Sequence, residues 1–251
     1  MAMTYPGGKG GSGVWQRIIN QMPPHKTYVE AFLGGGSVLL AKRPAVASIG
    51  IDADAAVIEA WRSSPATTPN LTLVHGDGIA WLSANETIST DTLVYLDPPY
   101  LMETRRAHRA IYRCELSDDD HQRLLAVIKR MTCMVILSGY WSEMYSDALK
   151  NWRTDTFMTR TRGGALAEEW LWMNFDPPFA LHDYRYLGEN FRERERIKRK
   201  ITRWKDRLIH MEPLEQHAIM AAISEIKGYR TDENSVVRAT SEPTWLTCPQ
   251  L

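Results

Sequence analysis

The chain has 251 residues, of which 44% are hydrophobic and 24% charged, the balance of an ordinary globular protein. This length favours one sizeable domain with appendages over two full domains. The 30 basic and 30 acidic residues give a formal net charge of zero, which excludes a polycation, so a nucleic-acid-binding surface would need a local concentration of positive charge.

The three cysteines, Cys114, Cys133 and Cys248, lie far apart and form no CxxC pair. This spacing argues against a disulfide framework and a cysteine-based zinc site, and we expect no metal. No apolar run approaches the length of a membrane span, and the segment MAMTYPGGKG lacks the apolar stretch of a signal peptide. We therefore expect a cytoplasmic protein that does not contact a membrane.

Short apolar runs alternate with segments of helical spacing along the chain. The runs expected to form buried strands are 28–32, 47–51, 71–74, 93–96 and 133–137, and the expected helices are 37–43, 53–61, 118–131 and 143–151. Such alternation predicts an α/β fold with a mostly parallel, doubly wound sheet that has helices on both faces. Residues 154–159 and 169–174 are expected to complete the sheet as an antiparallel edge hairpin.

The character of the sequence changes from about residue 184. Residues 191–208 carry nine basic and three acidic residues, which predicts a long charged helix. A second helix begins at Pro213 and is expected to end at Gly228. We therefore expect an α/β domain at 1–183, a charged helical extension at 184–228 and a loose polar tail at 229–251.

Three turns follow successive expected strands and share features of a ligand site. The first strand is followed by LGGGS at 33–37, where glycines allow either a tight turn or close approach of the backbone to a ligand. The spacing differs from the GxGxxG of a dinucleotide site. Asp52 ends the second strand and Asp77 follows the third. Each acid alone is best interpreted as a helix N-cap, but together the three turns favour a nucleoside pocket.

The motif Asp97-Pro98-Pro99-Tyr100 follows the fourth expected strand directly. Two prolines fix the backbone and remove two N–H donors, which leaves carbonyl groups free to accept hydrogen bonds. The aspartate and a proline carbonyl can accept hydrogen bonds from an amino group, while the tyrosine ring stacks on the attached base. The motif therefore indicates a site for a base that carries an exocyclic amino group.

These motifs together resemble the Dam-like (D12 class) adenine-N6 DNA methyltransferases, particularly their short phage and prophage members. The matching stretches are YPGGKG at 5–10, YVEAFLGGGSVLL at 28–40, GID at 50–52, HGD at 75–77, LDPPY at 96–100 and ILSGY at 136–140. The resemblance covers the chain up to about residue 174. It implies a Rossmann-like methyltransferase fold, S-adenosylmethionine as cofactor, double-stranded DNA as partner and a bacterial or phage-infected cell as setting.

The resemblance also implies roles for individual residues. The cofactor-binding residues would be Tyr5, Lys9, Glu30, Phe32, Gly34, Gly36, Asp52 and Asp77. Among them, Lys9, Glu30, Gly34 and Gly36 would line the methionine end, Asp52 would hold the ribose and Asp77 the adenine of the cofactor. The catalytic residues would be Asp97, Pro98, Pro99 and Tyr100, which would hold a target adenine flipped out of the duplex.

The chain departs from the family pattern where a recognition insert is usual, because only 78–96 separates Asp77 from the DPPY motif. Nucleic-acid-binding candidates are therefore sought among arginines elsewhere, at Arg105, Arg106, Arg109, Arg113, Arg160 and Arg162. A solvated loop is an equally good interpretation of the first four. The charged helix at 191–208 is left open between a second DNA contact, a dimerisation arm and a solvated surface.

Several alternatives stay open at this point. A cytosine-N4 or RNA adenine methyltransferase would use a similar pocket, although the aspartate of DPPY favours adenine. From other classes, a nicotinamide-dependent oxidoreductase leaves DPPY unexplained, and a non-catalytic DNA-binding protein conflicts with intact pocket residues. The second DPP, at 176–178, is interpreted as a strand-terminating turn. The recognition sequence, the oligomeric state and a role in restriction–modification or phage protection are not determined by the sequence.

Overall fold

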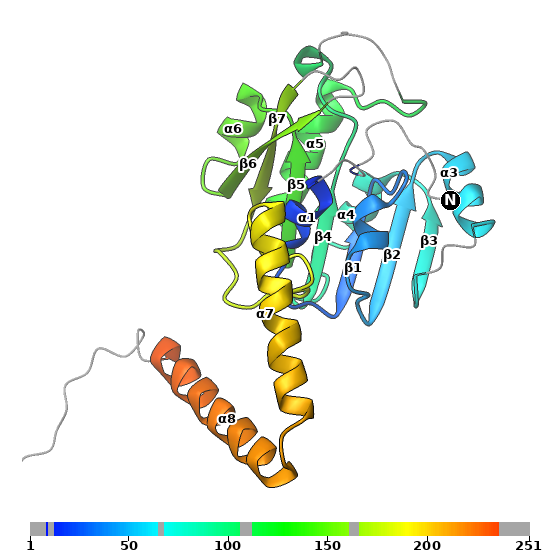
Figure 1. Cartoon of the computed structure of the whole chain (residues 1–251). Coiled ribbons are helices and arrows are strands. Elements are labelled where there is room, and N and C mark those ends of the chain that lie inside the picture. The colour runs from blue at the N-terminus through cyan, green and yellow to red at the C-terminus, as the bar shows by residue number, and fades with distance from the viewer. Residues whose placement is uncertain (1–8, 10–12, 65–67, 106–111, 161–165, 236–251) are drawn as a thin grey trace, which may run out of the picture. The chain divides into compact units, whose positions relative to one another are not determined.

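The computed structural model describes residues 9, 13–64, 68–105, 112–160 and 166–235, and the fold is built on one seven-stranded sheet (Figure 1). The strands are β1 (Thr27–Glu30), β2 (Ala47–Asp52), β3 (Leu71–His75), β4 (Thr92–Leu96), β5 (Met134–Gly139), β6 (Arg153–Arg160) and β7 (Leu166–Met173). Their order is β3-β2-β1-β4-β5-β7-β6. β1 to β5 pair in parallel, whereas β7 pairs antiparallel with both β5 and β6. The predicted mostly parallel sheet with an antiparallel edge hairpin is confirmed.

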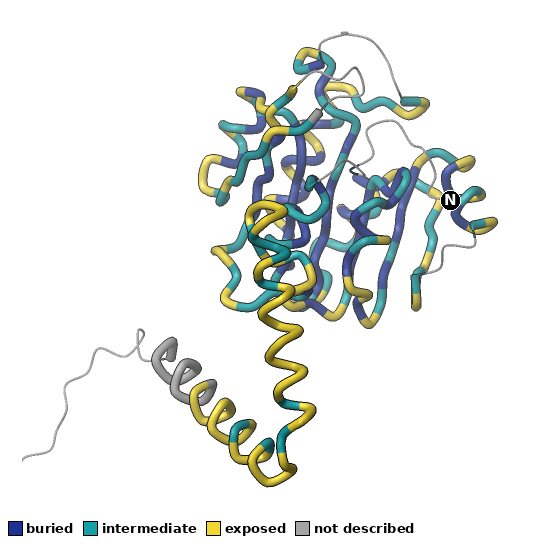
Figure 2. The backbone as a smooth tube through the Cα atoms, viewed as in Figure 1, coloured by how far each residue is buried: buried dark blue, intermediate teal, exposed yellow. Residues whose placement is uncertain are grey.

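Successive residues of the central strands enter two different hydrophobic clusters, because side chains alternate between the faces of a sheet. Val29, Val94 and Val135 belong to one cluster, while Tyr28 and Leu93 belong to the other. Both faces are therefore covered, which explains why these strands are continuous apolar runs in the sequence. Figure 2 shows the central strands as buried along most of their length.

Six helices of the first compact unit supply the covering layers. They are α1 (Val14–Ile19), α2 (Ser37–Ala41), α3 (Ala55–Arg62), α4 (Gly78–Ala84), α5 (Asp118–Ile128) and α6 (Glu143–Ala148). Buried residues of α1, α2 and α3 belong to the cluster of Tyr28, and those of α4, α5 and α6 to the cluster of Val29. The short helices α1 and α4 were not predicted, because six or seven residues hold too few turns for a recognisable helical period.

Side-chain caps fix where four of these helices begin. At the start of α6, Ser142 Oγ accepts a hydrogen bond from the Tyr145 N–H. Asp54 accepts a hydrogen bond from the Ala56 N–H at the start of α3. Ser117 and Asp120 form a capping box at the start of α5. Asp77 caps α4 by accepting from the Ile79 N–H at 2.8 Å. These caps hold the loops that follow the parallel strands in defined positions.

The second DPP follows β7, after its last residue Met173. Met173 pairs with Ile136 and Trp170 pairs with Gly139, so β7 runs opposite to β5. The end of β7 therefore lies at the sheet edge away from the carboxyl ends of the parallel strands. Asp176 lies in no helix or strand, in agreement with its interpretation as part of a strand-terminating turn.

The chain divides into two compact units, Met1–Arg194 and Glu195–Leu251. The boundary falls within α7 (Phe191–Ile209), and α8 (Pro213–Ser235) follows it. The long charged helix is therefore present, and none of its residues is buried. No helix in the described ranges is sufficiently long and apolar to span a bilayer.

The expected end of the second C-terminal helix at Gly228 is wrong, because α8 continues to Ser235. A glycine inside a helix costs about 1 kcal/mol relative to alanine, which weakens a helix without necessarily ending it. Of the expected loose tail, the part from 236 onward lies outside the described residues.

Candidate active site

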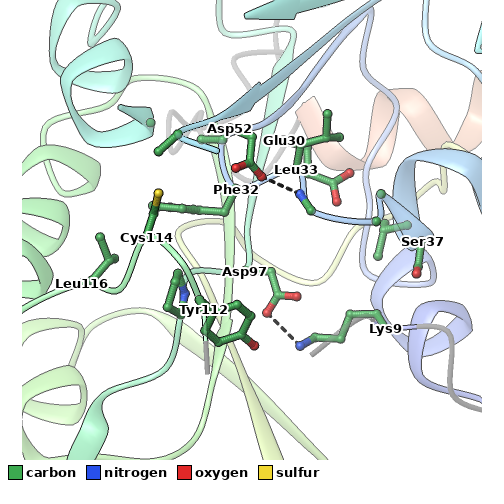
Figure 3. A pocket seen from close by; sticks show the side chains of 18 of the residues that line it. Lys9, Glu30, Phe32, Leu33, Ser37, Asp52, Asp97, Tyr112, Cys114 and Leu116 are labelled. Atoms are coloured by element: carbon green, nitrogen blue, oxygen red, sulfur yellow. Dashed lines mark hydrogen bonds and ion pairs between the residues drawn. The ribbon is translucent and has the colours of Figure 1, made fainter. Parts of the chain in front are cut away.

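One pocket lies where the parallel strands end, and it brings together most of the predicted site residues (Figure 3). Its lining includes seven predicted cofactor-binding residues and two residues of the DPPY motif: Lys9, Glu30, Phe32, Gly34, Gly36, Asp52, Asp77, Asp97 and Pro99. They come from the ends of β1, β2, β3 and β4 and from the N-terminal segment. The placement agrees with the general position of ligand sites in doubly wound sheets.

The glycine turn after β1 is both tight and closely packed. The Gly36 N–H donates to the Leu33 carbonyl at 2.8 Å, and Gly34 and Gly36 have φ values of 45° and 56°, in the left-handed region that favours glycine. The Trp61 Nε1–H donates to the Gly34 carbonyl at 2.9 Å. A Cβ added to Gly36 would lie 2.3 Å from Cζ2 of Trp61. The turn therefore needs glycine at Gly36 and exposes its backbone along the pocket.

Asp52 is fixed at the end of β2 by two backbone donors. Its Oδ2 accepts from the Gly34 N–H at 2.8 Å and its Oδ1 from the Asp54 N–H at 2.9 Å. Burial raises the pKa of the Asp52 carboxyl, although the two backbone hydrogen bonds act in the opposite direction. The carboxylate thus ties the glycine turn to the neighbouring strand and lines the pocket at the same time.

Asp77 combines the two interpretations that the sequence left open. It caps α4, as a simple helix cap would, and it also lines the pocket. The next residue, Gly78, packs so closely that an added Cβ would lie 2.2 Å from the Ala31 carbonyl oxygen. The start of α4 is therefore held against the end of β1, which keeps the Asp77 carboxylate at the pocket.

Asp97 lies at the pocket and does not point into the interior of the sheet. Its Oδ1 accepts hydrogen bonds from Lys9 Nζ at 2.7 Å and from Ser138 Oγ at 3.0 Å. No described residue donates a hydrogen bond to its other oxygen, Oδ2. Asp97 therefore presents one open acceptor oxygen next to the glycine turn.

Tyr100, the last residue of the motif, is held at both its hydroxyl and its ring. The hydroxyl donates to Glu169 Oε1 at 3.2 Å and accepts a hydrogen bond from Lys9 Nζ. The ring packs edge-on against Tyr140, with 4.6 Å between centroids. The Tyr100 side chain is thus braced by groups from three other parts of the chain.

Lys9 is in direct contact with the DPPY motif. It lines the pocket, but its ammonium pairs with the DPPY acid at 2.7 Å and lies 3.4 Å from Glu169 Oε1, and Lys9 is only 6% exposed. Burial lowers the pKa of Lys9, but the charges of Asp97 and Glu169 outweigh it and raise this pKa above its ordinary value. Lys9 is therefore a direct ion-pair partner of Asp97.

Glu30 is buried at the end of β1 and accepts a hydrogen bond from the Tyr28 hydroxyl at 3.1 Å. Burial is the main cause that raises the pKa of the Glu30 carboxyl to about 8, while the Tyr28 bond opposes the shift. The surroundings of Glu30 therefore favour its protonated form, in which a carboxyl group can donate a hydrogen bond.

Several residues of the site were not predicted as site residues. Tyr112, Cys114 and Leu116 line the pocket, and Ser138 and Glu169 contact the DPPY residues. Burial raises the pKa of the Tyr112 hydroxyl to about 12. The signal that was available for Glu169 is its position: an acidic residue on the inward face of an otherwise apolar strand.

The predicted DNA-contacting role of Arg105 is wrong for this structure. Arg105 is 6% exposed and binds Glu115 through both Nη1, at 2.8 Å, and Nη2, at 2.6 Å. A buried bidentate pair of this kind withdraws the guanidinium from the surface. Arg113 is exposed and lies 3.8 Å from Asp54.

The remaining predicted residues lie outside the described part of the chain. They are Tyr5, Arg106, Arg109 and Arg162, together with the side chain of Arg160. Pro98 is buried beside Asp97 and does not appear in the pocket lining. Among the described residues, no group of three His, Cys, Asp or Glu side chains is arranged to hold a metal ion.

The sheet order with its antiparallel β7, and the pocket at the carboxyl ends of β1, β2 and β4, are those of a Rossmann-like methyltransferase. The model of the D12 class N6 adenine-specific DNA methyltransferases matches residues 82–158, which include the DPPY motif. The resemblance predicted from the sequence is therefore confirmed over this segment. No curated protein matches the chain.

Solved structures that resemble the chain include three transferases. An rRNA methylase from Streptococcus thermophilus has 9% identity and a TM-score of 0.43, with 63% of this chain and 93% of that chain covered. A dimethyladenosine transferase from Plasmodium falciparum has 14% identity and a TM-score of 0.40, with 64% and 60% covered. A SAM-dependent methyltransferase from Agrobacterium tumefaciens has 10% identity and a TM-score of 0.40, with 65% and 59% covered.

Proposed function

We propose that the chain transfers a methyl group from S-adenosylmethionine to N6 of an adenine in DNA, after that adenine has been flipped out of the duplex. The observation that carries the proposal is the position of Asp97, whose open Oδ2 lies in the same pocket as the glycine turn. An acceptor for an amino group and a nucleoside site thus adjoin each other. The family match at 82–158 supports adenine N6 as the acceptor and DNA as the substrate.

The pocket has hydrogen-bonding groups that suit S-adenosylmethionine. The backbone of the glycine turn gives close approach without side chains, and the fixed carboxylates of Asp52 and Asp77 offer acceptors for ribose hydroxyls and for an adenine amino group. Glu30 also lines the pocket, and burial raises the pKa of its carboxyl. When bound, the cofactor supplies a methyl group on a positively charged sulfur.

The chain's own residues would act on the amino nitrogen of the base. Asp97 Oδ2 and the Pro98 carbonyl would each accept a hydrogen bond from one of its two N–H groups. These hydrogen bonds would favour a pyramidal nitrogen with a localised lone pair. That lone pair forms the new N–C bond, the electrons of the broken S–C bond stay on sulfur, and one proton leaves the nitrogen for solvent. Positioning and the negative charge of Asp97 supply the rate, and no covalent enzyme intermediate is required.

The DNA-binding surface is expected to be local, since the chain has no net charge. The α7 helix contains nine basic and three acidic residues, and none of its residues is buried. Without α7 the chain has 21 basic and 27 acidic residues and is therefore net negative. We propose that α7 contacts DNA phosphates, together with Arg113 and those predicted arginines that lie outside the described side chains.

The test is methyl transfer from tritiated S-adenosylmethionine to duplex DNA and to RNA, followed by nucleoside analysis. Label in N6-methyladenine from DNA is expected, whereas label in N4-methylcytosine or only in RNA would replace the proposal with the corresponding alternative. Asp97→Ala should abolish transfer while calorimetry still detects cofactor binding. A fully active Asp97→Ala variant would refute the assignment.

A further inference from the structure

Glu169, near the start of β7, is a buried acid that none of the sequence motifs includes. It is 6% exposed, and its Oε1 accepts from the Tyr100 hydroxyl at 3.2 Å and lies 3.4 Å from Lys9 Nζ. Its other oxygen, Oε2, is buried without a hydrogen-bond partner among the described residues. A carboxylate in this environment is costly unless a cation compensates it, and Lys9 is the cation in contact with it.

Lys9 therefore lies between two acids from different strands. Its ammonium contacts Asp97, which follows β4, and Glu169, which belongs to β7, and it donates to the Tyr100 hydroxyl between them. The Lys9 Nζ also lies 4.8 Å from the centroid of the Tyr100 ring. The four side chains form one connected group. Removal of Glu169 would take away one of the two acids that contact Lys9 and the acceptor of the Tyr100 hydroxyl.

The orientation of Asp97 depends on this group. Lys9 and Ser138 both occupy Oδ1, so the carboxylate cannot rotate without losing two hydrogen bonds. Oδ2 is consequently the oxygen that stays open. Burial raises the pKa of the Glu169 carboxyl, and the neighbouring Lys9 ammonium opposes that shift.

We infer that Glu169 is a positioning residue for methyl transfer: it anchors Lys9 and Tyr100, and through them keeps Asp97 Oδ2 directed at the amino group of the target base. The inference rests on the proposed function. A residue that fixes the geometry of the reacting groups changes the energy of the transition state more than that of the bound substrate. Its effect should therefore fall on kcat.

The direct test is Glu169→Gln in the full chain, which keeps the shape of the side chain and removes its charge. We expect kcat with duplex DNA to fall by about 10- to 100-fold, the scale of a small misplacement in an active site. The KM for DNA and the Kd for S-adenosylmethionine should stay at their wild-type values. The matched control is Glu168→Gln, one residue earlier in the same strand and exposed, which should leave kcat unchanged. An unaltered kcat in Glu169→Gln would overturn the inference.

A combined variant separates positioning from a general loss of structure. If Glu169 acts through Lys9 and Tyr100, then adding Glu169→Gln to the Lys9→Met, Tyr100→Phe double variant should cause no further loss of activity. Losses that multiply would overturn the inference. Should Glu169→Gln fail to fold, Tyr100→Phe removes the hydroxyl that bonds Glu169 and keeps the ring; a wild-type kcat there would equally overturn it.

The same experiments distinguish this inference from the function on which it rests. A wild-type chain without activity on any nucleic acid, with S-adenosylmethionine bound, would defeat the proposed function. An active wild-type chain whose activity is indifferent to Glu169→Gln and to Tyr100→Phe would defeat only the role of Glu169.

Discussion

Replacement of Gly36 by alanine tests whether the glycine turn is required by the packing of Trp61. The backbone at Gly36 has φ of 56°, and an added Cβ would lie 2.3 Å from Cζ2 and 2.8 Å from Cη2 of Trp61. The left-handed backbone costs an L-residue roughly 1–2 kcal/mol. Because the indole belongs to a packed core and cannot move freely, overpacking should add about 1–3 kcal/mol.

These two costs together amount to roughly 2–5 kcal/mol, which lowers the Tm of a domain of this size by roughly 4–20 °C. Displacement of Trp61 also breaks its hydrogen bond to the Gly34 carbonyl. The net value of such a bond, about 0.5–1.5 kcal/mol, corresponds to an increase of up to about tenfold in the Kd for S-adenosylmethionine.

The matched control is Gly13→Ala, at a left-handed residue with φ of 92° where an added Cβ has no described neighbour within 4 Å. This variant carries the backbone cost alone, roughly 1–2 kcal/mol. Thermal unfolding followed by circular dichroism and titration calorimetry with S-adenosylmethionine provide the two readouts. Equal losses of Tm in both variants, or an unchanged Kd in Gly36→Ala, would refute the reasoning about Trp61.

Further predictions concern charge. Burial raises the pKa of the Glu30 carboxyl from 4.5 to about 8. The contribution of Glu30 to the free energy of unfolding is therefore complete below pH 4.5 and is lost as the pH rises to about 8. A Glu30→Gln variant should show a shallower decline of Tm between pH 5 and 8. Arg105→Ala should cost about 3–5 kcal/mol in chemical denaturation, whereas the exposed Arg113→Ala should be neutral, and equal effects would contradict the burial argument. Charge reversal at Lys200 and Arg203 in α7 should flatten the salt dependence of DNA binding in fluorescence anisotropy; an unaltered slope, or a change of oligomeric state in light scattering, would instead identify α7 as a solvated or dimerising helix.

The parts of the site that were predictable from the sequence are those encoded locally. The glycine turn, Asp52, Asp77 and Asp97 each lie at or just beyond the end of an expected strand, so the expected strands alone place them at one edge of a parallel sheet. The sheet itself was predictable for the same reason, because strands that are buried on both faces are continuous apolar runs.

The parts that were not predictable depend on contacts between distant segments. Lys9 precedes Asp97 by 88 positions, and no periodicity or spacing indicates that the two form an ion pair. Similarly, Arg105 had the sequence context of a surface arginine, and its burial follows from the partner Glu115 ten positions later. Helix and strand patterns state which face of an element is apolar, but they do not state which charged groups meet.

The direction of β7 decides which of its neighbouring acids belongs to the site. Because β7 is antiparallel to β5, with Trp170 opposite Gly139, its beginning lies at the edge where the parallel strands end. Glu169 therefore meets the DPPY residues, while Asp176, beyond the end of the same strand, is carried to the opposite edge. A parallel seventh strand would exchange these positions and place the second DPP motif near the pocket. The edge hairpin thus contributes a charge to the active site in addition to completing the sheet, and Glu169→Gln measures that contribution.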